Sequence, residues 1–227
     1  MKNFLLSIAI FSLFSFKSFS HVEHYADFNY LEYELFRNNN SIGYHKYNFK
    51  RNGENLSVIS EVNFKITKLG VDLYSYFAKS DENYEKGIFK NYNSITKQNK
   101  KNRYVNINVD PINGDLIIDG SSYKGKASKN FIVGTWWNHE IIKAKAQISG
   151  ISGRIIDQTV TFIGKEDVII NGKTYKTLHF NFKSSDESLP ESKKLNTDIW
   201  YEENTYLWVK AAFDKTGYWE YRVKEVK

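Results

Sequence analysis

Apolar residues recur at every second position along most of this chain. Leu31, Tyr33 and Leu35 alternate with polar residues near the start. A longer run of the same kind comprises Leu56, Val58, Val62, Phe64 and Ile66. A period of two puts successive side chains on opposite faces of a β-strand. The pattern therefore predicts strands with one buried and one solvated face.

Short turn sequences separate these alternating runs. They include an Asn-rich stretch at residues 38–41, the pairs Asn113-Gly114 and Asn171-Gly172, and residues 214–217. Asn-Gly supplies the positive φ angles that tight hairpins require. About a dozen strands joined in this way predict a single antiparallel all-β domain. We expect a strongly curved sheet that forms an open or incomplete barrel, because so many strands seldom stay flat.

Few segments interrupt the strand pattern. Residues 135–146, after Gly134, and residues 185–194 are the candidates for short helices. Gly150-Ile151-Ser152-Gly153 superficially matches loops that bind phosphate or RNA, but an alternating run follows it where those loops need a helix. We interpret it as a turn.

The first twenty residues have the layout of a secretory signal peptide. A short positive start precedes an apolar run at residues 4–16, and small residues stand at Ser18 and Ser20. The apolar run has 13 residues, fewer than the roughly 20 that a helix needs to span a bilayer. We expect removal of residues 1–20 near Ser20, export to the periplasm, and a mature β domain of residues 21–227 without a transmembrane anchor.

Composition narrows the chemistry. Cysteine is absent and the formal net charge is +6. The absence of cysteine excludes disulfides, thiolate metal sites and thiol catalysis, so a hydrophobic core must stabilise the domain. We expect no nucleic-acid partner, because an exported protein rarely meets one. The basic run at residues 97–103 is interpreted as a solvated hairpin tip, with a headgroup or polyanion contact as the alternative.

Trp136, Trp137 and His139 form the densest aromatic cluster, in a segment without regular periodicity. Aromatic side chains on loops commonly line ligand pockets, and a histidine adds a titratable donor or acceptor. The alternative is that the Trp pair packs onto one end of the barrel.

His45 shares a strand face with Tyr47 and Phe49. On an apolar face it is either a hydrogen-bonded core residue or a polar contact inside a ligand cavity. By contrast, His179 falls on a polar face and is expected to be exposed.

No catalytic or metal motif stands out, and we expect no cofactor. Cleavage after Ser20 would expose His21, whose α-amine and imidazole can together chelate Cu(II), with His24 three residues on. The alternative is a terminus that frays without function.

Several segments together resemble a family of exported bacterial proteins known only as a domain of unknown function. They are the opening hairpin with residues 42–47, the Thr-aromatic-Trp segment at 135–138, and the closing strands from 198–202 to 217–221. These segments occur in the family's order across most of residues 28–224. The family has no established activity, so no catalytic residue transfers. The resemblance implies a fold similar to the half-open barrels of periplasmic lipoprotein carriers, whose curved sheet wraps an apolar cavity under a helical lid.

Residues and resemblance together give one functional prediction. We expect a periplasmic protein without enzymatic activity that binds a hydrophobic or amphipathic ligand, such as a lipid or lipid-linked glycan. The expected ligand-binding residues are Trp136, Trp137, His139, His45, Tyr47, Phe49 and Trp200. Two alternatives stay open. One is an enzyme that modifies envelope polysaccharide or lipid, and the other is a scaffold whose sheet edge pairs with an envelope protein.

Overall fold

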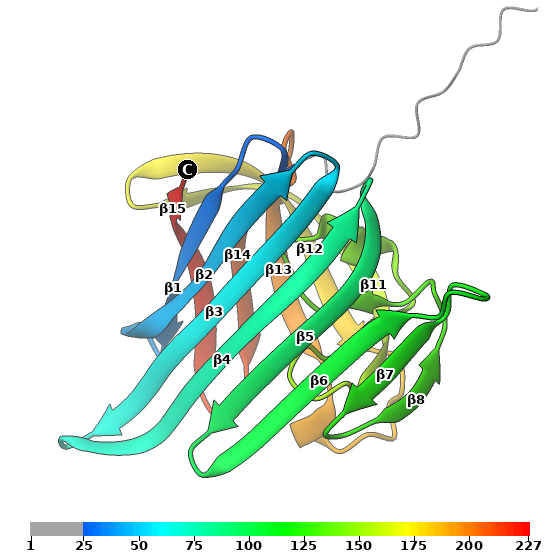
Figure 1. The fold of residues 1–227 in the computed structure, drawn as a ribbon. Helices are drawn as coiled ribbons and strands as arrows, with labels where there is room; N and C mark the ends of the chain where they lie inside the picture. Colours follow the sequence, from blue (N-terminus) through cyan, green and yellow to red (C-terminus); the bar gives the residue numbers. More distant parts are fainter. Residues whose placement is uncertain (1–24) are drawn as a thin grey trace, which may run out of the picture.

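The computed structural model describes residues 25–227, so the expectations about the signal peptide, His21 and His24 lie outside it. In the described residues, fifteen strands form one continuous sheet (Figure 1). The strands are β1 (Tyr30–Arg37), β2 (Asn40–Asn52), β3 (Asn55–Lys68), β4 (Val71–Glu85), β5 (Ile88–Gln98), β6 (Lys101–Val109), β7 (Leu116–Gly120), β8 (Lys124–Ala127), β9 (Ile132–Val133), β10 (Ala146–Ile148), β11 (Ile155–Ile170), β12 (Lys173–Ser184), β13 (Asn196–Glu202), β14 (Trp208–Asp214) and β15 (Tyr218–Val226).

The sheet has two arms that meet at β1 and β15. Its order is β8-β7-β6-β5-β4-β3-β2-β1-β15-β14-β13-β12-β11-β10-β9, and β9 with β10 is the parallel pair. Only residues 128–131 connect the two edge strands, β8 and β9. So short a connection reaches at most about 18 Å, which requires the sheet to curl until its edges approach each other. Within the described residues the edges do not pair, and the predicted all-β open barrel is confirmed.

Burial follows the predicted alternation. Leu31, Tyr33 and Leu35 are 0% exposed, and polar neighbours separate them along β1. The predicted Asn-rich turn and the tight Asn171-Gly172 turn are confirmed, whereas Asn113-Gly114 lies in a longer loop, residues 110–115, in which Gly114 but not Asn113 has a positive φ. Asn38 and Asn39 have φ angles of 48° and 63°, as a two-residue hairpin turn demands. The basic run at residues 97–103 forms the tip between β5 and β6, as predicted.

The last strands of the second arm roll inward against the first arm. Val133 and Ile148 pack in one core cluster with Val105 and Ile107 on the inner face of β6. A Cβ at Gly120 would lie 2.5 Å from the carbonyl oxygen of Ser152, so this close approach requires glycine. The predicted turn at residues 150–153 is therefore present, and it packs against the inside of the sheet.

The predicted helices are shorter than expected. The segment 135–146 contains one 3-10 turn, η2 (His139–Lys143), and the segment 185–194 contains η3 (Glu191–Lys193). Three consecutive residues, 137–139, are buried just before and at the start of η2. A helix with a single apolar stripe cannot bury three residues in a row, so tertiary contacts decide this conformation. No helix in residues 25–227 has the length and apolar character needed to cross a membrane.

Candidate functional site

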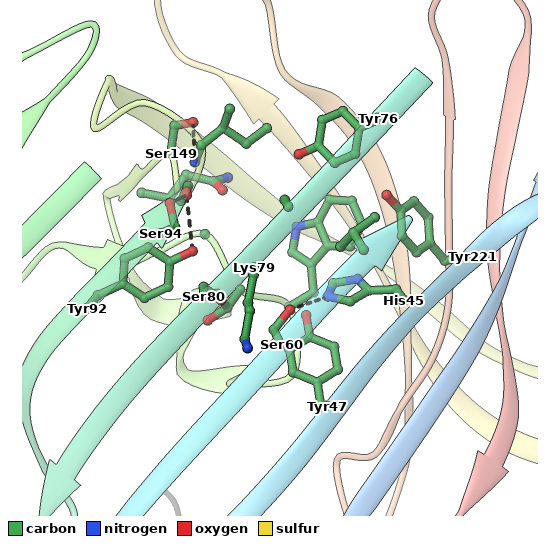
Figure 2. A pocket seen from close by; sticks show the side chains of 18 of the residues that line it. His45, Tyr47, Ser60, Tyr76, Lys79, Ser80, Tyr92, Ser94, Ser149 and Tyr221 are labelled. Carbon is green, nitrogen blue, oxygen red and sulfur yellow. Dashed lines mark hydrogen bonds between the residues drawn. The ribbon is translucent and has the colours of Figure 1, made fainter. Parts of the chain in front are cut away.

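A pocket of about 240 Å³ lies on the inner face of the sheet. It is the space left between the sheet and the segments 134–136 and 147–151, which pack against its inside. Its floor comes from β2 to β5, and Tyr221 of β15 closes one side. Residues 134–136 and 147–151 cover it from the opposite side. Figure 2 shows the side chains of these elements converging on one space.

Three serines create the hollow in the floor. Ser60 of β3 is the cross-strand partner of Ser80 of β4, which in turn partners Ser94 of β5. In the adjacent row, Val62 faces Ala78. Side chains this small on neighbouring strands leave space that larger apolar residues fill elsewhere on the inner face.

Aromatic side chains form the walls and the roof. Tyr47, Tyr76, Tyr92 and Tyr221 line the pocket, and Trp136 covers it. The Trp136 ring lies 5.2 Å from that of Trp208 and 5.4 Å from that of Tyr221, both edge-on. The hydroxyl of Tyr201 donates to the Trp136 carbonyl at 2.9 Å. These contacts hold the roof residue in place.

Apart from Lys79, the polar residues that line the pocket are neutral. Nε2 of His45 lies 2.8 Å from Oγ of Ser60, and Nδ1 has no hydrogen-bond partner within residues 25–227. Burial lowers the pKa of His45 to about 3, so its imidazole is uncharged at physiological pH. Burial also raises the pKa of the Tyr92 phenol to about 12. Among the described residues no carboxylate lines the pocket, and no group of three acidic or histidine side chains is placed to hold a metal.

A buried carboxyl group anchors the segment that covers the pocket. Oε2 of Glu82 accepts hydrogen bonds from Nε1 of Trp137 and Oγ1 of Thr135, both at 3.0 Å, and Oε1 accepts from the Tyr84 hydroxyl. Burial raises the pKa of Glu82 to about 7, and these hydrogen bonds oppose part of that rise. Trp137 is 1% exposed and packs edge-on against Phe49. Trp137 and Phe49 therefore belong to the core beside the pocket.

His139 lies away from the pocket. Its ring stacks on Tyr206 with 4.5 Å between centroids, and its Nε2 is 3.3 Å from Oε1 of Glu140. Neither contact faces the serine floor.

Trp200 lies on the opposite sheet face from its buried neighbours Ile199 and Tyr201. It stacks on His179 at 4.2 Å. His179 bridges two carboxylates, with 2.9 Å to Glu166 and 3.0 Å to Asp198. The histidine expected to be exposed is thus half-buried in an outer-face cluster.

The structure brings together three of the seven expected site residues, His45, Tyr47 and Trp136, at one pocket. Sequence reasoning missed its three floor serines, Ser60, Ser80 and Ser94. One signal was present, because Ser60 interrupts the apolar alternation of the run 56–66. Locating the other two required the register between strands.

Comparisons with known proteins give a family without an assigned activity. Residues 33–224 match the model of DUF6134, a domain of unknown function. No curated protein matches the chain. The crystal structure of a DUF1329 family protein from Desulfovibrio piger is 9% identical, with a TM-score of 0.26 over 91% of this chain and 89% of that one. This likeness is too low to support conclusions about function. The match over residues 33–224 shows that the chain belongs to the DUF6134 family, in agreement with the resemblance found in its sequence.

Proposed function

We propose that this chain is an exported binding protein that holds a small hydrophobic or amphipathic molecule, such as part of a lipid or lipid-linked glycan, in the inner-face pocket. The observation that carries the proposal is the cavity between the serine floor and the Trp136 roof. Carriers and binding proteins commonly use such a site, with mostly apolar walls and a few convergent polar groups.

The size of the pocket limits the ligand. Packed core clusters fill much of the concave face, and the serine-floored pocket has a volume of about 240 Å³. Sites for drug-sized ligands usually measure about 300–1,000 Å³. We therefore expect a single small molecule, or the end of one acyl chain, rather than an entire lipid with several chains.

The lining suggests how an amphipathic molecule would lie. Val62, Ile151 and Ile156 offer apolar contact to its body. His45 and the floor serines offer hydrogen bonds to a hydroxyl, amide or carbonyl group. Because His45 and the serines are uncharged, the ligand group that they bond is expected to be neutral.

The two alternative functions have less support. An enzyme that modifies polysaccharide or lipid needs acid and base groups together, but this pocket contains one imidazole and no carboxylate among the described residues. A scaffold needs a long exposed edge strand. The edge strands here are β8, with four residues, and β9, with two, and Lys124 and Lys126 on β8 disfavour strand addition.

Filling the cavity tests the proposal. Ser80→Leu places a bulky apolar side chain in the floor, whereas Asn93→Leu places the same side chain on the outer face of the next strand. Titration with a fluorescent fatty acid should give saturable binding that Ser80→Leu weakens at least about tenfold, equivalent to roughly 1.4 kcal/mol. Asn93→Leu should bind as the wild type does. Equal affinities for both variants, or no saturable binding by the wild type, would remove the proposal.

A further inference from the structure

The hairpin of β3 and β4 projects beyond its neighbours. On one side, the last β2 residue that pairs with β3 is Gly43, opposite Phe64. On the other side, pairing with β5 ends at Tyr76, opposite Gln98. Residues 65–75 therefore continue as a two-stranded ribbon, which extends to the lower left in Figure 1.

The end of this ribbon exposes large apolar side chains. Leu69 is 96% exposed, Val71 61% and Leu73 56%. Leu69 also occupies the turn with a φ angle of 51°, where asparagine or glycine costs less. Neither core packing nor turn geometry accounts for leucine at this position, whereas contact with a partner outside the chain would.

Cations gather at the same end of the sheet as these apolar residues. The neighbouring β5–β6 tip carries Lys97, Lys100, Lys101 and Arg103, and Oδ1 of Asn99 accepts a hydrogen bond from the Ser75 amide of the ribbon. Together the segments 65–75 and 97–103 contain six cations and one carboxylate, which is five of the chain's six net positive charges. In the described part of the chain, Lys65 alone of these six cations forms an ion pair, with Asp72.

We propose that these two tips dock the protein onto the surface of an anionic lipid bilayer. Leu69, Val71 and Leu73 would enter the boundary between headgroups and acyl chains, where apolar area is removed from water. The lysines would lie among the headgroup phosphates, whose negative potential attracts them. A soluble polyanion would use the cations but leave the apolar residues in water. This docking extends the proposed function without resting on it, because it involves no residue of the pocket.

The opposite end of the sheet provides a natural control. It also exposes large apolar residues, with Ile88 at 65% and Ile112 at 92%. However, Lys86 and Lys90 in this region pair with Glu54 and Glu85, at 3.3 Å and 2.8 Å. Apolar exposure is thus present at both ends, but uncompensated positive charge accompanies it at the β3–β4 end.

Single-site labelling tests the orientation directly. Because the chain has no cysteine, Leu69→Cys and Ile112→Cys can each carry one environment-sensitive fluorophore. Vesicles of phosphatidylglycerol and phosphatidylethanolamine should shift the emission of the residue 69 label to the blue and leave that of residue 112 unchanged. Vesicles of phosphatidylcholine should shift neither. An equal shift at both positions, or an equal response to phosphatidylcholine, overturns the proposal.

Vesicle flotation separates the two contributions to docking. The set Lys97→Gln, Lys100→Gln, Lys101→Gln and the pair Val71→Ser, Leu73→Ser should each lower the bound fraction at least about tenfold. The controls Lys86→Gln with Lys90→Gln, and Ile88→Ser, should bind as the wild type does. If only the lysine set lost binding, and if the wild type bound heparin as tightly as it binds vesicles, the site would be a polyanion site and membrane docking would be refuted. A shift of the residue 69 label that depends on protein concentration without vesicles would refute it in favour of self-association.

Discussion

Glu82 carries a carboxyl group that is buried among neutral donors. Tyr84, Thr135 and Trp137 bond to it, and the described residues place no cation beside it. Its pKa rises to about 7 in the fold, against an ordinary value of 4.5, because burial disfavours the charged form. The protonated form therefore stabilises the fold fully below the ordinary pKa, and this contribution is lost as the pH rises through about 7.

The stability of the protein should depend on pH through this residue. The shift corresponds to about 3 kcal/mol of unfolding free energy that is present near pH 4.5 and absent above neutral pH. Urea denaturation measures the difference in unfolding free energy between wild type and Glu82→Gln. Between pH 4.5 and a pH above neutral, this difference should change by about 3 kcal/mol. Glu187→Gln, at an exposed carboxylate, is the matched control. A Glu82→Gln difference that stays constant with pH would contradict the assigned burial.

At the scale of elements, the hydrogen bond from Trp137 to Glu82 is one of those that attach the covering segment to the sheet. Trp137→Phe removes the Nε1 donor to the buried Glu82, while Trp200→Phe removes an equivalent donor to the half-exposed Glu166. Water can replace the second bond but not the first. We expect a cost of about 1–3 kcal/mol for Trp137→Phe beyond that of Trp200→Phe, measured by urea denaturation above neutral pH. Equal costs would show that the Glu82 contact does not hold this segment.

The close approach of the rolled-in turn gives a second prediction at this scale. A Cβ at Gly120 would collide with the Ser152 carbonyl, whereas one at Gly164 meets nothing within 4 Å. Gly120→Ala should therefore destabilise the fold by about 1–3 kcal/mol. Gly164→Ala should be neutral or slightly stabilising. Thermal denaturation of both variants would test this, and a neutral Gly120→Ala would mean that the turn does not press on the sheet.

Local patterns account for what could be predicted at this scale. The strands and hairpin turns follow from a period of two and from Asn-Gly chemistry, which act within a few residues. The conformation of the covering segment could not be derived in the same way. Its residues 137–139 are buried consecutively because they contact residues distant in sequence, such as Glu82. The pocket floor depends on which residues of β3, β4 and β5 lie opposite one another. Alternation assigns a residue to a face, but the cross-strand register of Ser60, Ser80 and Ser94 comes only from the fold.

At the scale of the whole molecule, one curved sheet places two features at different points of the same arm. The pocket lies against the inner face of β2 to β5, and the ribbon of residues 65–75 extends from β3 and β4 beyond it. Between them, Phe64 stacks on Tyr76 at 4.8 Å and on Tyr74 at 5.9 Å. An aromatic cluster thus lies between the tips that we propose to dock on a membrane and the pocket that we propose for the ligand.

Native mass spectrometry of the protein, purified gently from its own host without detergent, tests the central proposal most directly. We expect the wild type and Asn93→Leu to carry a small adduct that dissociates on activation, and Ser80→Leu to lack it. A bare polypeptide mass for the wild type, unchanged after incubation with fatty acid, would contradict the binding function. An adduct that persists equally in Ser80→Leu would place the ligand outside the serine-floored pocket.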